Sequence, residues 1–203
     1  MTESASWLAP VILRDSAVTL EPLSRDHVEG LQRAVVDGEL WRLWYTSAPR
    51  PEATAAYVET ALAAQAGGSA LPFVVRDRDG EIVGTTRYYD MTPTHRRLSI
   101  GYTWYAARVQ RSALNTQAKQ LLLGHAFEQG QAIAVEFQTH WMNHRSRAAI
   151  ARLGAKQDGV LRNHMVMADG SYRDTVVFSI IDSEWPTVRR HLQHLRERWE
   201  PAQ

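Results

Sequence analysis

A stretch of alternating side chains near the middle of the chain constrains the fold most. Within residues 98–105, Leu, Ile, Tyr and Trp alternate with Ser, Gly, Thr and Tyr, which is the period of a β-strand. A basic segment follows at 108–111, and apolar residues then recur at helical spacing over 115–128. A strand that turns directly into a helix is typical of folds that pack helices against a sheet. The chain is therefore expected to form an α/β structure.

The remaining elements are predicted from the same two periods and from the turn-forming residues between them. Asp79-Gly80 and Asp169-Gly170 each separate two apolar runs and predict hairpins. The predicted elements are an opening strand or hairpin over 11–20, helices over 24–37 and 51–65, strands over 73–75, 82–89 and 98–105, a helix over 115–128, a strand over 133–140, a helix over 143–153, strands over 160–167 and 172–181, and a helix capped by Ser183 that reaches Trp199.

Length and composition favour one folded domain. The chain has 203 residues, of which 44% are hydrophobic and 22% charged, close to the averages of globular proteins. No repeat, low-complexity tract or linker divides it. We therefore predict a single domain over residues 1–203, built on a mixed sheet, with a core at about 10–182 and a C-terminal helix at 183–203.

Charge and cysteine content exclude several functions. The 23 Lys and Arg residues nearly balance the 22 Asp and Glu residues, so the chain lacks the broad positive field that nucleic-acid binding needs. It contains no cysteine, hence no disulfide or thiolate metal site, and no metal site is predicted. Residues 1–13 hold no apolar run long enough for a signal peptide or membrane helix. We expect a cytoplasmic protein without nucleic-acid or membrane partners.

The segment between the central strand and its helix is the first candidate site. Residues 110–116 read Gln-Arg-Ser-Ala-Leu-Asn-Thr and lead into the helix start. A helix start leaves backbone N–H groups unpaired at the positive end of the helix dipole, and small residues there let a phosphate group approach. The segment can therefore bind an anion, although its local sequence alone fits an ordinary strand-to-helix loop better.

A second candidate lies at the next helix start, after the strand that ends near His140. Asn143 and Ser146 open the helix predicted at 143–153, and Gly154 closes it. Asn and Ser at such positions usually cap the helix through their side chains. Taken singly, these residues therefore predict a cap.

The first segment resembles a motif of the GNAT acyltransferase family, specifically of its RimJ/RimL-like branch. That family carries Gln/Arg-x-x-Gly-x-Gly/Ala at the helix after its fourth strand, and residues 110–115 are similar to it. Ala113 stands where Gly is usual and Asn115 where Gly or Ala is usual. The backbone at Ala113 therefore lacks the conformational freedom of glycine.

The second segment resembles another signature of the same family. The family carries Asn, a small residue three positions on and Gly eleven positions on, at the helix after its fifth strand. Asn143, Ser146 and Gly154 have this spacing, and the resemblance covers about residues 10–186. It extends through Ala155, 159–162, 169–170, 173–174 and 184–185.

This resemblance implies a fold and a cofactor. In the family, the fourth and fifth of about seven strands splay apart, and the pantetheine arm of coenzyme A lies between them. Segments 98–105 and 133–140 would be those strands, and the loop at 111–116 would hold the pyrophosphate of acetyl-CoA or coenzyme A. The implied cofactor-binding residues are Tyr102, Thr103, Trp104, Tyr105, Gln110, Arg111, Ser112, Ala113, Leu114, Asn115, Thr116, Asn143 and Ser146.

The resemblance also implies how protons would move. Many family members have a Tyr that protonates the departing thiolate and a Glu that acts as base, but the corresponding positions here are Ile150 and Ser99. Ser146 is the implied substitute acid, with helix capping or cofactor positioning as its alternative. His140 titrates near neutral pH and is the candidate base, acting directly or through water, with an exposed polar strand end as the alternative.

Together these features predict transfer of the acetyl group of acetyl-CoA to a primary amine by direct attack in a ternary complex. The acceptor would be a protein N-terminus, a peptide or a small-molecule amine, and the resemblance allows a homodimer. An aromatic cluster formed by Trp41, Trp44 and Tyr45 would either cover the acceptor or form local core, and we favour the second interpretation. Because the usual Tyr and Glu are missing, a catalytically weak acyl-CoA-binding sensor or scaffold is the alternative.

Overall fold

One mixed β-sheet organises the protein, for which a computed structural model describes residues 7–198. Its eight strands lie in the order β1-β2-β3-β4-β5-β6-β8-β7. Neighbouring strands are antiparallel except β5 and β6, which run parallel. The strands are β1 (Leu13–Asp15), β2 (Val18–Pro22), β3 (Leu71–Asp77), β4 (Ile82–Thr92), β5 (Arg97–Tyr105), β6 (Ala134–His140), β7 (Lys156–Val166) and β8 (Tyr172–Ile181).

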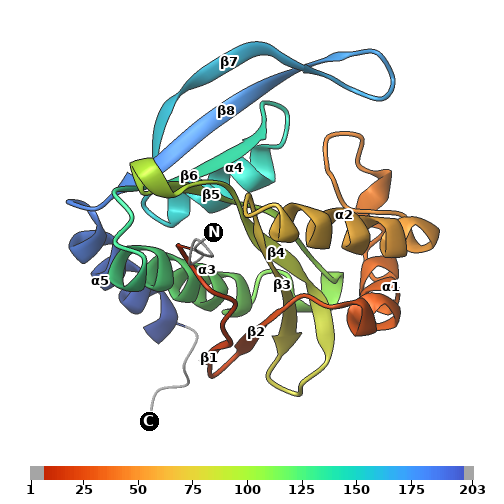
Figure 1. Ribbon diagram of the computed structural model, residues 1–203, viewed down its shortest axis with the longest axis horizontal. Helices are drawn as coiled ribbons and strands as arrows, with labels where there is room; N and C mark the ends of the chain where they lie inside the picture. Colours follow the sequence, from red (N-terminus) through yellow and green to blue (C-terminus); the bar gives the residue numbers. More distant parts are fainter. Residues whose placement is uncertain (1–6, 199–203) are drawn as a thin grey trace, which may run out of the picture.

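Helices cover both faces of this sheet. Figure 1 shows α1 and α2 on one side and α3 with α5 on the other, while α4 packs against β6 and β8. The strands β5 and β6 lead through short loops into α3 and α4. Within residues 7–198, no helix is long and apolar enough to cross a membrane. The helices are α1 (Val28–Val36), α2 (Thr54–Ala66), α3 (Leu114–Gly124), α4 (His144–Arg152) and α5 (Trp185–Glu197).

The predicted α/β fold is confirmed, with two differences in detail. The expected count of about seven strands becomes eight, because the opening segment forms two short paired strands, β1 and β2. The predicted cap at Ser183 is wrong, since α5 begins after Glu184 without a side-chain cap. Pro186 lies in its first turn, where a missing N–H costs no helical hydrogen bond. The predicted end at Trp199 lies outside the described residues.

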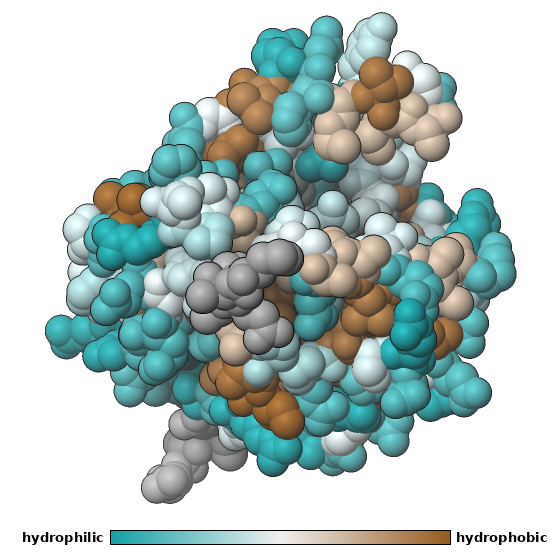
Figure 2. Space-filling view, in the orientation of Figure 1, coloured by the Kyte–Doolittle hydropathy of each residue, from teal (hydrophilic) through white to brown (hydrophobic). Residues whose placement is uncertain are grey.

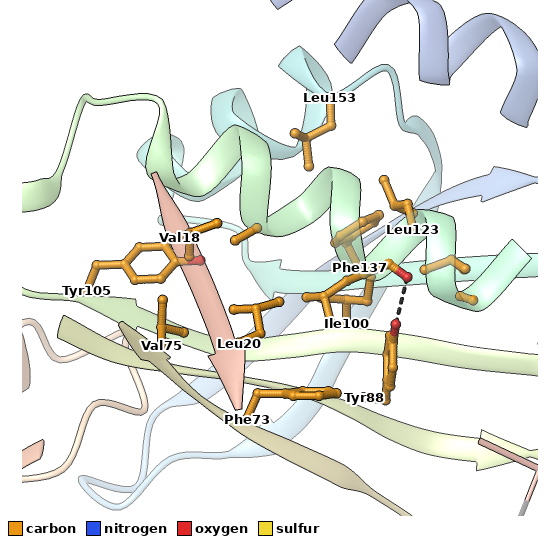
Figure 3. Packing of buried hydrophobic residues seen from close by; sticks show 14 of the residues in the cluster. Val18, Leu20, Phe73, Val75, Tyr88, Ile100, Tyr105, Leu123, Phe137 and Leu153 are labelled. Carbon is orange, nitrogen blue, oxygen red and sulfur yellow. Dashed lines mark hydrogen bonds between the residues drawn. The ribbon is translucent and has the colours of Figure 1, made fainter. Parts of the chain in front are cut away.

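The apolar core between the sheet and α3 fixes the position of this helix. Phe73 of β3 and Tyr88 of β4 are fully buried, and their rings meet edge to face with centroids 5.7 Å apart. Figure 3 shows them in one cluster with Ile100 of β5 and Leu123 of α3. The Tyr88 hydroxyl donates to the Leu122 carbonyl oxygen at 2.6 Å, so this buried hydroxyl has a hydrogen-bond partner. The last turn of α3 is therefore held firmly beside β4 and β5.

The β7–β8 hairpin projects from the rest of the molecule. It forms the arch at the top of Figure 1, and β7 is the outer edge of the sheet. Leu161, Met165, Val166 and Tyr172 are exposed apolar residues on this hairpin. Figure 2 shows apolar and polar side chains intermixed over this part of the surface. The hairpin therefore offers side chains for contact outside the core.

Candidate active site

The carboxyl ends of β5 and β6 separate from each other. The two strands pair only through residues 97–99 and 134–136, at their first three positions. Beyond these, β5 continues to Tyr105 and β6 to His140 without pairing to each other. Backbone N–H and C=O groups along this gap can therefore bond a ligand that carries amide groups. The predicted splay of these two strands is confirmed.

A β-bulge lies on β5 within this gap. The register between β4 and β5 shifts between Thr85 and Arg87, so that Thr86 alone opposes both Tyr102 and Thr103. Tyr102 has a φ of +51°, in the left-handed region that residues other than glycine rarely adopt. Such strain persists only where the surrounding structure enforces it, and it is frequent at functional sites.

The side chains of residues 102–105 divide between the gap and the core. Trp104 and Tyr105 are 5% and 8% exposed, so their rings belong to the core and their backbone is what can meet a ligand. Tyr102 is 42% exposed, and the Arg87 guanidinium lies 4.0 Å from its ring centroid. Gly84 allows β4 to pass closely here, because a Cβ on it would lie 2.0 Å from the Trp104 carbonyl oxygen.

The predicted anion-binding loop lies between β5 and α3. The Gln110 side chain donates to the Tyr105 carbonyl oxygen at 2.9 Å and holds the loop against the strand. Ser112 Oγ donates to the Val109 carbonyl oxygen at 2.7 Å and accepts the Leu114 N–H at 3.3 Å, which shapes the turn into the helix. The first amides of α3 have no carbonyl partner within the helix, so they can bind an anion.

The backbone of this loop tolerates the departures from the family motif. Ala113 has φ −64° and ψ −23°, a helical conformation that any residue adopts, so the missing glycine costs no strain. Arg111 takes the positive φ instead, at +58°. One turn into α3, the buried Thr116 Oγ1 has no hydrogen-bond partner among the described residues. An unpartnered buried hydroxyl beside unpaired amides fits a polar group bound at this helix start.

Asn143 and Ser146 meet at the start of α4. The Asn143 side-chain oxygen accepts the Ser146 N–H at 3.0 Å, which makes Asn143 the N-cap and confirms the predicted capping for Asn143. This bond uses the backbone of Ser146, so its half-buried hydroxyl is not part of the cap. Gly154 follows the helix with a φ of +97°, the conformation in which glycine commonly ends a helix.

A cavity of about 560 Å³ lies where β6 ends, beside the open end of the gap. His140 and Trp141 line it from β6 and the turn after it. Asp174 and Tyr172 line it from the β7–β8 hairpin, and Trp44 from the connection between α1 and α2. The cavity is therefore built from three segments that are distant in the sequence.

His140 is buried in the wall of this cavity, only 4% exposed, rather than at an exposed strand end. Its Nδ1 accepts the Met142 N–H at 3.0 Å, so the neutral ring carries its proton on Nε2, which has no partner among residues 7–198. Burial, aided by the Arg173 guanidinium, lowers the pKa of His140 below its ordinary 6.5. In this form the ring is neutral and offers an N–H donor.

Two ionised carboxylates lie beside the cavity. Asp174 accepts the Asn163 N–H at 2.8 Å and Arg162 Nε at 2.6 Å, and the backbone bond, followed by the guanidinium, lowers the pKa of its carboxyl. Asp169 accepts the hydroxyl and the N–H of Ser171, which lowers the pKa of this carboxyl as well. Asp174 is thus paired with Arg162, which also lines the cavity, so Asp169 is the carboxylate left to attract a cationic ligand.

The aromatic residues between α1 and α2 divide between the cavity and the core. The prediction that Trp44 forms local core is wrong, because this residue is 54% exposed and borders the cavity. Its ring lies edge to face with that of His140, with the two centroids 4.8 Å apart. Trp41 packs against the core as expected. Ile150 and Ser99, at the positions of the usual acid and base, are both buried and supply neither group.

Comparison with known proteins identifies the family. The profile described as Acetyltransferase (GNAT) domain matches residues 17–156. The chain belongs to the GNAT acetyltransferases, and it is an enzyme that uses acetyl-CoA as acetyl donor.

Individual relatives indicate the branch. The chain is 28% identical over 107 residues to a Bacillus subtilis (strain 168) protein named "Putative ribosomal N-acetyltransferase YdaF", and this match covers 53% of the chain and only 57% of YdaF. A GCN5-related N-acetyltransferase from Brucella melitensis is 26% identical with a TM-score of 0.81, covering 92% of this chain and 85% of the other. Mycobacterium smegmatis RimJ, solved with CoA-disulfide, shares the fold at 23% identity and TM-score 0.75, with 92% and 93% covered. These similarities support the RimJ/RimL-like branch.

Proposed function

We propose that this enzyme transfers the acetyl group to a primary amine by direct attack within a ternary complex. The acceptor would be a protein N-terminus, a peptide or a small-molecule amine. The observation that carries the proposal is the cavity at the open ends of β5 and β6, because a donor in the gap and an amine in the cavity would meet there. Bound acetyl-CoA supplies an activated thioester, so holding the two reactants together with water excluded provides most of the rate.

The cofactor would be held mainly by backbone groups. Residues 111–116 would bond the diphosphate through the N–H groups at the start of α3, and residues 102–105 would bond the pantetheine amides. The lack of pairing between β5 and β6 along the gap and the unpartnered Thr116 hydroxyl support this assignment. Asn143, with its oxygen engaged in the cap, retains an amide N–H₂ group for the cofactor arm.

Two side chains would assist the proton transfers. Ser146, whose hydroxyl takes no part in the cap, would hydrogen-bond the leaving sulfur and relay to it a proton that water returns to the hydroxyl. His140 cannot accept a proton at Nε2 while Nδ1 accepts the Met142 N–H, so the amine proton would leave through water. The role we propose for His140 is to orient that water or the acceptor through its Nε2–H.

The cavity has the chemistry to collect an amine. Primary amines are cations in neutral solution, and the ionised Asp169, which has no ion pair among the described residues, would raise their local concentration. The exposed Trp44 ring adds a surface on which an ammonium group can stack. These groups would bind the acceptor, whereas acetylation would occur on its neutral form.

The test is an acetyl-CoA turnover screen with release of coenzyme A as the signal. The acceptors are N-terminal peptides of ribosomal proteins, chosen because of the name of YdaF, together with polyamines, amino acids and aminoglycosides. Each peptide is paired with a copy whose N-terminus is blocked, so that α-amine and side-chain acetylation are separated. Binding of acetyl-CoA without release above hydrolysis for every class would contradict the proposal and favour the sensor alternative.

We also propose that residues 1–203 act as one domain, in the cytoplasm, as a monomer or homodimer. The single continuous sheet supports the one-domain organisation. The absence of cysteine supports the cytoplasmic location. Light scattering on purified protein measures the oligomeric state directly.

A further inference from the structure

The helix α3 carries a buried lysine that the proposed mechanism does not use. Lys119 is 6% exposed, and it is one of two lysines in a chain that otherwise carries its positive side chains on arginine and histidine. Its Nζ donates to Thr103 Oγ1 at 2.7 Å and to Thr86 Oγ1 at 3.2 Å. Thr86 and Thr103 are the opposed residues of the β5 bulge, and their hydroxyls lie 2.8 Å apart. Lys119 therefore ties α3 to both strands at the bulge.

This lysine is buried without a counter-charge. Among the described residues, no Asp or Glu forms an ion pair with it. A buried ammonium without a carboxylate is unfavourable, and burial lowers the pKa of Lys119 to about 7. At neutral pH the amine is therefore near balance between its charged and neutral forms, and a charge bound nearby would decide between them.

The side chain of Lys119 leans toward the proposed diphosphate site. Lys119 follows Leu114, the first residue of α3, by five positions, which is about 8 Å along the axis at ~1.5 Å per residue. Side chains on a helix point toward its N-terminus, which brings the amine closer to the unpaired amides. Thr116 lies one turn nearer the start, with its buried Oγ1 unpartnered. Buried polar groups thus extend from the bulge toward the helix start.

We propose that Lys119 is the internal counter-charge of the cofactor's diphosphate, and that it thereby positions the β5 bulge for the pantetheine arm. This inference rests on the proposed function, which puts the diphosphate at the start of α3. An anion there would stabilise the ammonium across a poorly hydrated interior. The charged amine also bonds the Thr103 and Thr86 hydroxyls more strongly than the neutral amine does, which would hold the bulge. Lys119 is a positioning residue, since it touches no reacting atom.

Other ionisable groups around α3 do not compete for this role. The Tyr88 hydroxyl lies 3.2 Å from His125 Nδ1, and the Tyr105 phenol is buried. Asp15 of β1 forms an ion pair with Arg196 of α5 at 2.8 Å. Burial raises the pKa of both tyrosines far above neutrality and lowers that of His125 below 6.5. At pH values above the pKa of His125 and below the pKa values of the two tyrosines, Lys119 is the group around α3 that is expected to titrate.

The direct test is NMR of protein labelled with ¹³C-lysine, in which two lysines give two Cε signals and Lys156→Met assigns them. Each signal is followed against pH in the free protein and with saturating dephospho-CoA, which lacks the titrating 3′-phosphate. We expect Lys119 to titrate near pH 7 when free. With dephospho-CoA bound, its midpoint should rise by at least about one pH unit. Lys156, which is exposed and paired with Glu184, should not move.

The outcomes separate this inference from the proposed function. Pantetheine, which has the amide arm but no diphosphate, should leave the Lys119 midpoint unchanged. An equal midpoint with and without bound dephospho-CoA overturns the inference alone, as does a rise with pantetheine alone. Failure of the wild-type protein to bind dephospho-CoA overturns both.

A variant gives a second, independent test. Lys119→Met removes the charge and keeps the length of the side chain, so melting temperature should rise while dephospho-CoA affinity falls about tenfold. A purely structural lysine would give the opposite result, a lower melting temperature with unchanged affinity, and this would overturn the inference. Lys156→Met, on the exposed β7, is the matched control and should change neither quantity.

Discussion

The two sides of the candidate site differ in what builds them. On the cofactor side, β5 and the start of α3 present mainly backbone groups, held by buried contacts such as the close passage of Gly84 beside Trp104. On the acceptor side, Trp44 and the β7–β8 hairpin present exposed side chains. Backbone groups fixed by a core cannot change without changing the fold, whereas exposed loop side chains can. The first side therefore suits a constant cofactor and the second a variable acceptor.

The largest effect is expected at Ser146, the proposed proton donor at the start of α4. Ser146→Ala should lower kcat by about 10² to 10⁴-fold with little change in the KM for acetyl-CoA, because a positioned proton donor is lost. Stability should not change, since the helix cap uses the Ser146 N–H and not its hydroxyl. Steady-state kinetics under conditions where chemistry limits turnover, together with thermal unfolding, measure both quantities.

Asn143→Ala is the control for the cap itself. It removes the acceptor of the Ser146 N–H and should cost about 1 kcal/mol of unfolding free energy. A Ser146→Ala enzyme within about threefold of wild-type kcat would remove this hydroxyl from the mechanism.

The next effect is a difference in stability loss between a glycine on the cofactor side, Gly84, and a glycine on the acceptor side, Gly159. Gly84→Ala would place its Cβ 2.0 Å from the Trp104 carbonyl oxygen and should cost about 2 to 4 kcal/mol of stability, with weaker binding of acetyl-CoA as the bulge shifts. Gly159→Ala on β7 meets nothing within 4 Å and should cost less than about 0.5 kcal/mol. Chemical denaturation of the two variants measures the difference, and equal losses would contradict the contrast.

This contrast also explains which parts the sequence could predict. The strand at 98–105 and the loop at 110–116 are contiguous, so period and turn residues reveal them. The contacts of Lys119 join it to Thr103 and Thr86, 16 and 33 residues away, and no local pattern records such a pairing. The positive φ of Tyr102 is equally hidden, because the bulge imposes it on a residue that does not favour it.

A smaller effect is expected at His140, and it tests the donor role. His140→Ala should lower kcat/KM about tenfold, the cost of one lost hydrogen bond, whereas His140→Gln retains an N–H donor and should recover most of it. If His140 acted as a base instead, both variants would lose kcat/KM to the same extent. Protonation of His140 at Nδ1 would displace the Met142 N–H and place a positive charge beside the cationic acceptor, so it should add an acidic limb, with a midpoint below 6.5, to the pH dependence of the acceptor amine itself. This acidic limb of the pH–rate profile should vanish in His140→Gln.

The smallest effect lies at Trp44, and it shows whether the acceptor side acts apart from the fold. Trp44→Ala should raise the KM for cationic acceptors about two- to fivefold, the worth of an exposed cation–π contact, and Trp44→Phe should retain part of it. Stability should not change, whereas Trp41→Ala, which loses a contact with the core, should lower the melting temperature. The loss of the Trp44 ring beside His140 should also hydrate the imidazole. Since burial lowers the pKa of His140, the acidic limb should then move to higher pH. An unchanged KM with an unmoved limb would mean that the acceptor does not bind in this cavity.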